Sequence, residues 1–337
     1  MELIERPNLK AVEFLNSKTY SEYKDECIQD ALMDGKQKPK EKDMKAWFAT
    51  LKYFCATNIK TKGITKRIYS YSLNTPAGLG GKLFSGGSIQ GIWGKYRGLL
   101  MRGLGTDIDM ANAHPTILRY VCHLHQITCP CLECYVNNRD ICLSQFSSRA
   151  SGKDAYFIAM NNDKYSRNSS LPQAFRDFDK EMKTIQKTLG VLDDYKDLID
   201  TVPENKKKNN FYGCVLNRIL CYFENIILQH VIHVINNRGI EVAVLMFDGL
   251  IIYGDFYDRP DLIMEIQNFF DDQMPGLSMK WTYKPHDTSI EVPDDFKIPD
   301  KLSMTNLFDS VAAEFEKYHC KNIKPFSSKK LRKRKKL

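Results

Sequence analysis

An acidic turn between two apolar segments constrains the fold of this chain more than any other feature. Residues 244–253 have the sequence VLMFDGLIIY, in which Asp248 and Gly249 separate two short apolar runs. Short apolar runs bounded by a turn are typical of buried β-strands, so the segment predicts a hairpin with Asp248 at its turn. A carboxylate held by two buried strands is rigidly positioned, as a ligand of a catalytic metal ion must be.

A second acidic segment lies upstream, where residues 106–118 have the sequence TDIDMANAHPTIL. Successive strand residues point to opposite faces, so we expect Asp107 and Asp109 to share one face while Ile108 packs behind them. Residues 114–124 carry apolar side chains at helical spacing and predict a helix after the strand. Asp109 therefore lies at a predicted junction between a strand and a helix.

The two acidic segments together predict a metal site. A lone aspartate beside a turn more often caps a helix or accepts backbone hydrogen bonds, so the prediction depends on both contexts occurring together. We expect Asp109 and Asp248 to hold two Mg²⁺ ions about 4 Å apart, with Asp107 as a further candidate ligand. Mn²⁺ can substitute for Mg²⁺. This arrangement favours phosphoryl transfer as the chemistry.

Composition is that of a globular chain with a charged tail. The 337 residues are 43% hydrophobic, enough for a large core in one domain or in two to three subdomains. The formal net charge is +8, and residues 329–336 carry seven cations, which leaves 8 − 7 = +1 for the rest. The charge pattern therefore predicts a basic tail and not a basic body.

Three motifs in sequence order resemble those of DNA polymerases. Asp109, four residues, then His114-Pro-Thr-Ile is similar to motif A of family A and family B enzymes. The FDG sequence at 247–249 resembles the single-aspartate motif C of family A enzymes and phage-type RNA polymerases, and KKKNNFYG at 206–213 resembles motif B. Over residues 82–285 the chain is similar to the shortened family A-like DNA polymerases of transposons, virophages and large DNA viruses, which lack an exonuclease.

The resemblance implies an α+β fold: a polymerase palm, which is an antiparallel sheet with helices, a helical fingers insertion and a helical N-terminal region. The implied divisions are an N-terminal helical region at 1–75, palm and fingers at 76–290 with motif A at 107–118, motif B at 204–213 and motif C at 244–253, a C-terminal segment at 291–326, and a disordered basic tail at 327–337.

The resemblance also implies roles for single residues. Asp109 and Asp248 would be the catalytic metal ligands, and His114 would occupy the position that excludes a ribose 2′-hydroxyl. Tyr212 would stack beneath the incoming base, and Gly213 would let the template backbone approach.

The lysine of motif B departs from the family pattern. The families place it seven or eight residues before the tyrosine, where this chain has Asn205 and Glu204. Lys208 lies four residues before Tyr212 and would share its helical face, so we favour Lys208 as the triphosphate ligand, with Lys206 second. The alternative is that these lysines form a solvated helix face.

Arginines near aromatic residues suggest contacts with nucleic acid. Arg97 and Arg102 precede motif A, and Arg139 follows it closely after Tyr135. Phosphates pair with such cations and bases stack on the rings, so we expect Arg97 and Arg102 to contact nucleic acid and Arg139 to contact substrate. Surface arginines that cover packed tyrosines are the alternative. Gln90 is a further candidate for a template contact.

A group of cysteines and histidines raises the question of zinc. The group comprises Cys129, Cys131, Cys134, His123 and His125. The Cys-x-Cys-x-x-Cys spacing is not that of a standard zinc knuckle, and no distant second pair of cysteines completes a four-ligand site. The sequence therefore favours structural cysteines here.

The function that the resemblance implies is a template-dependent nucleotidyltransferase, specifically a DNA-directed DNA polymerase in viral or mobile-element replication. Primed DNA and nucleoside triphosphates are the implied partners, and a separate helicase or primase is a further partner that the resemblance allows. One alternative is a primase-polymerase of the archaeo-eukaryotic type, because Asp107-Ile108-Asp109 and Asp248 also resemble its acidic pattern, although its Ser-x-His motif is not found. Another is a non-catalytic nucleic-acid-binding replication factor.

The sequence also bears on location. No uninterrupted apolar run approaches the roughly 20 residues of a membrane span, and the first residues lack the features of a secretory signal. We therefore expect an intracellular protein without a membrane partner, in the host cytoplasm or nucleus if it is viral. Its ten cysteines would then stay reduced.

Overall fold

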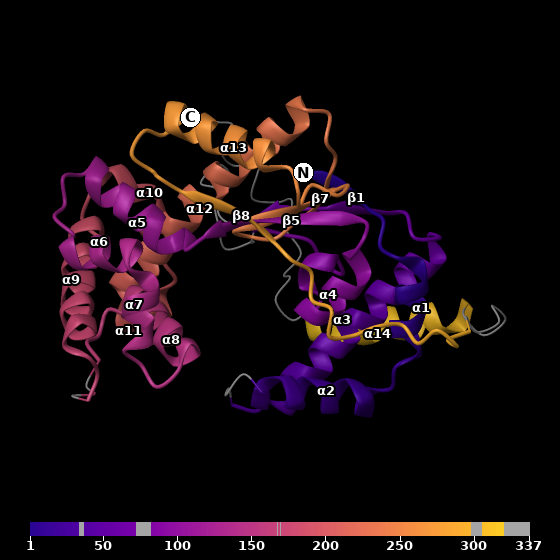
Figure 1. Cartoon of the computed structure of the whole chain (residues 1–337). Helices are drawn as coiled ribbons and strands as arrows, with labels where there is room; N and C mark the ends of the chain where they lie inside the picture. The colour runs from indigo at the N-terminus through magenta and orange to yellow at the C-terminus, as the bar shows by residue number, and fades with distance from the viewer. Residues whose placement is uncertain (34–36, 72–81, 167, 169, 298–304, 320–337) are drawn as a thin grey trace, which may run out of the picture.

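The computed structural model describes residues 1–33, 37–71, 82–166, 168, 170–297 and 305–319 (Figure 1). The predicted mixture of helices and antiparallel sheet is confirmed. The strands are β1 (Glu2–Glu5), β2 (Thr65–Ile68), β3 (Ser70–Tyr71), β4 (Leu83–Phe84), β5 (Gly105–Ala111), β6 (Val242–Leu245), β7 (Gly249–Tyr253) and β8 (Lys280–Lys284).

The helices fall into an N-terminal group, a group inserted between β5 and β6, and two that follow. They are α1 (Leu9–Ser17), α2 (Tyr20–Met33), α3 (Glu41–Lys60), η1 (Ile89–Gly91), α4 (Gly94–Met101), α5 (Ala113–Leu124), α6 (Pro130–Asn137), α7 (Arg139–Ser144), α8 (Arg149–Asn161), α9 (Gln173–Leu189), η2 (Asp193–Tyr195), α10 (Lys196–Asp200), α11 (Glu204–Asn209), α12 (Phe211–Asn237), α13 (Pro260–Gln273) and α14 (Thr305–His319).

A four-stranded antiparallel sheet forms the centre, in the order β6-β7-β5-β8. Each face of the sheet contributes to a different hydrophobic core. Ile108 packs on one face with residues of α5, α12 and α13, whereas Ile251 packs on the other with residues of α1, α3 and α4. Asp107 is the register partner of Ile251, so Asp107 and Asp109 lie on the face toward α4. This alternation fixes the direction of both carboxylates.

The inserted helices form a body beside one end of the sheet, on the left in Figure 1. Its central element is α12, which contacts α5, α8 and α9. By length and mean hydropathy α12 is the described helix that could cross a membrane, although polar residues interrupt its apolar sequence. Half of its most apolar window is buried within the protein, which is the position of a core helix.

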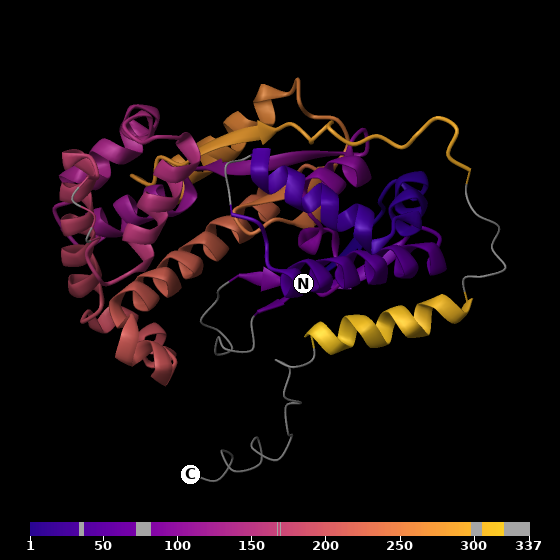
Figure 2. The same cartoon turned by 90° about the horizontal axis from the view of Figure 1, so that it is seen from below.

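The N-terminal region forms a second body on the other side of the sheet. It was expected to be helical, but it also contains strands: β1 and β2 pair antiparallel and bring residue 2 opposite residue 68. Helix α14 lies along α3 (Figure 2), and the ring of Phe315 stacks on Tyr53 with centroids 4.2 Å apart. The predicted basic tail at 327–337 lies outside the described residues.

Candidate active site

The two predicted acidic segments meet at the centre of the sheet. Strand β5 pairs with β7 so that Asp109 lies opposite Gly249, and the amide of Met110 donates a hydrogen bond of 2.9 Å to the carbonyl oxygen of Asp248. A Cβ atom at Gly249 would lie 2.2 Å from the carbonyl oxygen of Ile108, so the approach of the two strands requires glycine there. Asp248 is thereby fastened to the end of β5.

The backbone on both acidic segments has left-handed residues. Phe247, directly before Asp248, has φ of 62°, and Asn112, three residues after Asp109, has φ of 58°. Side chains other than glycine seldom adopt this region, and it occurs often at functional turns. Asn tolerates this region better than most residues, so it is the turn at Phe247 that is held in a conformation its own side chain disfavours.

Burial and mutual repulsion raise the pKa values of three carboxyl groups. Burial, and then the charge of Asp248, raise the pKa of Asp109 to about 6. Burial, and then the charge of Glu224, raise the pKa of Asp248, and burial raises that of Asp107. Each group would release its proton more readily if a cation lay beside it.

Nearby cations compensate these charges only in part. Among the described residues, Lys284 is the ion-pair partner of Asp109, at 3.9 Å, and its side chain is 55% exposed. Arg97 lies close enough to interact with all three aspartates, but burial lowers its pKa. The aspartates therefore form a site of excess negative charge whose oxygen ligands suit Mg²⁺ or Mn²⁺.

A cleft of about 620 Å³ opens beside Asp109 and Asp248. Its floor is the end of β5 with the turn at 246–248, and its walls come from α5, α8, α12 and the start of α7. Three of its basic side chains are Lys82, Arg139 and Lys153. Asp107 is only 7% exposed and is not among the described residues that line this cleft.

His114 occupies a defined position in the cleft. Its Nε2 atom lies 3.2 Å from a carboxylate oxygen of Glu224, and the Nζ atom of Lys82 lies 3.0 Å from the other oxygen. Burial alone would raise the pKa of Glu224, but His114 and Lys82 outweigh burial and lower it. No sequence pattern singles out Glu224, because it lies within an apolar helix and is distant along the chain from Asp109.

Helix α8 contributes a face that sequence reasoning missed. Lys153, Phe157 and Asn161 all line the cleft, and their spacing of four residues places them on one side of a helix. Phe157 is 60% exposed, so a large ring is presented to the cleft without being buried in the core. The spacing could have revealed this face, but the segment lies outside the three motifs.

The expected motif B is divided into two helices. Asn210 has φ of −162° and separates α11 from α12, because its side chain donates to the carbonyl oxygen of Asn161 at 2.8 Å and accepts from the amide of Asp163 at 2.9 Å. Lys206 and Lys208 lie on α11, where they are exposed and are not among the described residues lining the cleft. The single helix carrying both lysines and Tyr212 was therefore a wrong expectation.

The other motif B residues pack against the body. The ring of Tyr212 covers Gly190, and Tyr212 is not among the described residues that line the cleft. A Cβ atom at Gly213 would lie 2.4 Å from the carbonyl oxygen of Asn161, so Gly213 allows α12 to approach the end of α8. Gly213 was expected to let a template backbone approach closely. In the structure it lets the backbone at Asn161 approach closely.

The remaining candidates differ in their positions. Arg139 lines the cleft, and its Nε atom is buried without a hydrogen-bond partner in the described structure. Arg97 lies near the aspartates, as noted. Arg102 donates to the carbonyl oxygen of Ile290 at 3.3 Å, and Gln90 is 7% exposed and donates to the backbone of Leu83 and Leu245. The side chain of Gln90 therefore joins two backbone segments, and its contact with a template stays a prediction.

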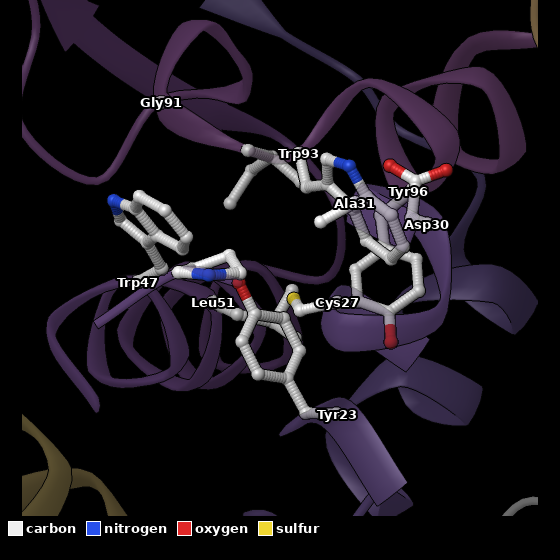
Figure 3. Close-up of a pocket in the computed structure, with 11 residues that line it drawn as sticks. Tyr23, Cys27, Asp30, Ala31, Trp47, Leu51, Gly91, Trp93 and Tyr96 are labelled. Atoms are coloured by element: carbon white, nitrogen blue, oxygen red, sulfur yellow. The ribbon is translucent and has the colours of Figure 1, made fainter. Parts of the chain in front are cut away.

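A second cavity, of about 270 Å³, lies in the N-terminal body. Tyr23, Trp47 and Trp93 line it, together with Asp30 (Figure 3). Asp30 is paired with Lys95 at 2.8 Å. The cavity has mainly apolar walls and none of the three aspartates of the sheet, so we take the 620 Å³ cleft as the candidate active site.

Comparison with known proteins supports the same type of fold. No family model matches the chain. Over 282 residues the chain is 24% identical to "Putative helicase V13" of Sputnik virophage; the match covers 78% of this chain and 34% of that protein, so the chain spans about a third of the length of this relative.

Among solved structures, the chain is similar to the POL domain of Pol1 from M. smegmatis, determined in complex with DNA primer-template and dNTP. The TM-score is 0.55 at 10% identity, covering 84% of this chain and 67% of that chain. At this identity the similarity shows the fold alone: the chain has a DNA polymerase-like fold.

Proposed function

We propose that this chain is a template-dependent nucleotidyltransferase, a DNA-directed DNA polymerase of the shortened family A-like type found in mobile elements and large DNA viruses. The observation that carries the proposal is the meeting of Asp109 on β5 with Asp248 in the turn before β7, where both line one cleft. The polymerase-like fold supports it. In this proposal the four-stranded sheet is the palm and the inserted body from α5 to α12 is the fingers.

Asp109 and Asp248 would hold two Mg²⁺ ions, with Asp107 behind them. Their raised pKa values fit this role, since a carboxylate that is buried near other carboxylates gains most from a bound cation. When bound, the ions would activate the attacking 3′-hydroxyl and stabilise charge on the leaving oxygen. Asp107 is more buried than Asp109, so we assign it a smaller role: its negative charge would add to the attraction of the site for the metal ions.

The residues of the cleft would bind and orient the nucleotide. Lys153 and Arg139 are cations that line the same cleft as Asp109 and Asp248, where they would neutralise a triphosphate as its bridging oxygens gain charge. Phe157 offers a ring on which the incoming base can stack. His114, held by Glu224, would lie against the sugar and exclude a 2′-hydroxyl. Lys153 on α8 thus replaces Lys208 as the proposed ligand of the triphosphate.

A hollow next to the cleft would accommodate nucleic acid. It has a volume of about 960 Å³, and it shares Ala111 and Arg139 with the cleft. Arg119, Arg149 and Lys280 also line it, and such side chains pair with phosphates. We assign Arg97, which interacts electrostatically with the three aspartates, to the primer end that must reach them.

Primer extension by the purified full chain tests the proposal. We expect incorporation of deoxynucleotides on a primed DNA template with Mg²⁺ or Mn²⁺, release of pyrophosphate, and no product on an unprimed template. Products on the unprimed template would identify a primase-polymerase instead. Binding of primed DNA without incorporation under either metal would identify a non-catalytic replication factor and overturn the proposal.

A further inference from the structure

Three possible metal ligands meet where α5 ends and α6 begins, away from the cleft aspartates. They are His123 in the last turn of α5, Cys129 at the N-cap of α6, and Glu133 one turn into α6. One donor atom from each residue lies within 4.8 Å of the others. The group does not include Cys131 or Cys134, although both belong to the cysteines and histidines that raised the question of zinc in the sequence. It does include Glu133, which was not among those residues.

The connection between the two helices fixes the group. The amide of Ile127 donates to the carbonyl oxygen of Cys122 at 2.8 Å, so the chain after α5 folds back on that helix. Residues i and i+4 share a helix face, and the amide of Glu133 donates to the carbonyl oxygen of Cys129 at 2.9 Å. Glu181 accepts from the amides of Cys131 and Leu132, at 2.8 Å each, and secures the start of α6.

The chemistry and spacing of the three donors suit zinc. In a tetrahedral zinc site, neighbouring donor atoms are about 3.3–3.6 Å apart, because Zn–S is near 2.3 Å and Zn–N near 2.0 Å. The Nε2 atom of His123 is 2.9 Å from the carboxylate of Glu133, so small side-chain rotations would bring all three donors to that spacing. Thiolate and imidazole favour zinc over Mg²⁺, which distinguishes this group from the aspartates of the sheet.

A simple surface ion pair would not account for the buried thiol. His123 and Glu133 are about half exposed, and such pairs contribute little to stability. Cys129, in contrast, is 2% exposed, and its thiol is hydrogen-bonded to that of Cys122, the kind of neighbour that orients a metal ligand. A hollow of about 400 Å³, lined by all three ligand residues, leaves the fourth coordination position open to solvent.

We propose that His123, Cys129 and Glu133 bind one zinc ion, with solvent as the fourth ligand, and that the ion ties the end of α5 to the start of α6. This site is independent of the proposed polymerase activity. Another group in the chain, His114, Cys221 and Glu224, has comparable spacing. Its carboxylate is already paired with Lys82 at 3.0 Å, so it is the less favourable site.

The test is zinc and cobalt binding by the reduced full-length protein and four variants. We expect one equivalent of zinc in the wild type, in Cys134→Ser on the same helix, and in Cys221→Ser. Cys129→Ser and His123→Gln should bind zinc at least about a hundredfold more weakly. Cobalt should give a thiolate-to-metal charge-transfer band in the wild type, Cys134→Ser and Cys221→Ser, and none in Cys129→Ser. His123 is exposed, so its variant should fold even if Cys129→Ser does not.

Thermal melting gives a second readout that does not depend on catalysis. Zinc should raise the melting temperature of the wild type and Cys134→Ser, and should leave that of His123→Gln unchanged. A wild type that binds no zinc would overturn the proposal. Equal zinc binding by the wild type, Cys129→Ser and His123→Gln would also overturn it, as would loss of zinc in Cys221→Ser with retention in Cys129→Ser.

Discussion

Asp109 lies where the fold itself opposes ionisation. Its neighbours along β5 are buried, Asp248 is fastened beside it, and Lys284 is the distant and largely exposed cation that faces it. A pKa of about 6 means that an ionised Asp109 costs stability at neutral pH unless a cation is supplied. Buried carboxyl groups with shifted pKa values, whose ionisation destabilises the fold, are common at catalytic sites.

Replacement of Asp109 by Asn should therefore stabilise the metal-free protein. The folded pKa lies above the unfolded value near 4, so the folded state loses stability as pH rises from about 4 through 6. At pH 7.5 in EDTA, Asp109→Asn should be about 1–3 kcal/mol more stable than the wild type, and the difference should shrink toward pH 4. Melting curves of both proteins across this pH range check the prediction. It is contradicted if the stability difference between Asp109→Asn and the wild type is no larger at pH 7.5 than at pH 4.5.

Added Mg²⁺ should reverse this order. The wild type should gain stability with Mg²⁺ concentration, and Asp109→Asn should gain little, because the ion binds the carboxylates of the folded state. Equal shifts in both proteins would indicate that the ion binds elsewhere.

His114 should determine the choice of sugar. Its imidazole lies in the cleft at the start of α5, with Nε2 3.2 Å from a carboxylate oxygen of Glu224. His114→Ala should raise the use of ribonucleotides relative to deoxyribonucleotides by about tenfold, equivalent to about 1.4 kcal/mol. Glu224→Gln should shift the ratio in the same direction but less, because the ring remains and only its charged partner is lost.

Incorporation ratios for both sugars decide this point. If the wild type already accepts ribonucleotides and His114→Ala loses them, the imidazole donates a hydrogen bond to the 2′-hydroxyl and does not exclude it. An unchanged ratio in both variants would place His114 away from the sugar.

At the scale of elements, the segments that carry the aspartates could be predicted from sequence. The apolar runs around Asp248 and the alternation at Asp107 and Asp109 are local patterns, and each formed the expected strand. The break between α11 and α12 could not be predicted, because it depends on Asn210 binding the backbone of Asn161, 49 positions away in sequence. Contacts of this kind depend on tertiary structure, which overrides helix propensity.

The same limitation explains why parts of the site were missed. Glu224 and Lys153 become site residues only because the folded chain brings α12 and α8 to the same cleft as Asp109. Cys129 becomes a neighbour of His123 only because the turn after α5 folds back. Conversely, the lysine run at 206–208 looked like a phosphate-binding segment, yet it lies on a short exposed helix.

Helices α8 and α11 provide a matched test of the nucleotide site. Lys153→Ala should raise the apparent KM for deoxynucleotides by about tenfold or more with little change in DNA affinity, because the lost charge faces the triphosphate. Lys208→Ala removes the same side chain from the exposed α11 and should change KM less than twofold. Steady-state kinetics on one primed template measure both. If Lys208→Ala raised KM more than Lys153→Ala did, Lys208 would be the triphosphate ligand, as the sequence had suggested.

At the scale of the whole molecule, charge is distributed unevenly. Seven cations occupy residues 329–336, outside the described part of the chain. Clusters of this kind bind polyanions without sequence preference. We propose that they add to the affinity for nucleic acid and take no part in catalysis.

Deletion of residues 329–337 should flatten the salt dependence of DNA binding. Each lost phosphate contact lowers the slope of log affinity against log salt by roughly 0.7 on single strands. Primer extension at low salt should stay within about twofold of the full chain. An unaltered slope in binding titrations would mean that the tail serves another purpose, such as nuclear import.

The central claim is that Asp109 and Asp248 hold the catalytic metals, and single-turnover incorporation by their Asn variants tests it most directly. Asp258→Asn, an exposed aspartate beyond β7, is the control and should match the wild type. Asp109→Asn and Asp248→Asn should each lose at least about a thousandfold in rate, or about 4 kcal/mol of transition-state stabilisation, with unchanged circular dichroism and DNA binding. A rate within tenfold of the wild type in either correctly folded variant would contradict the account.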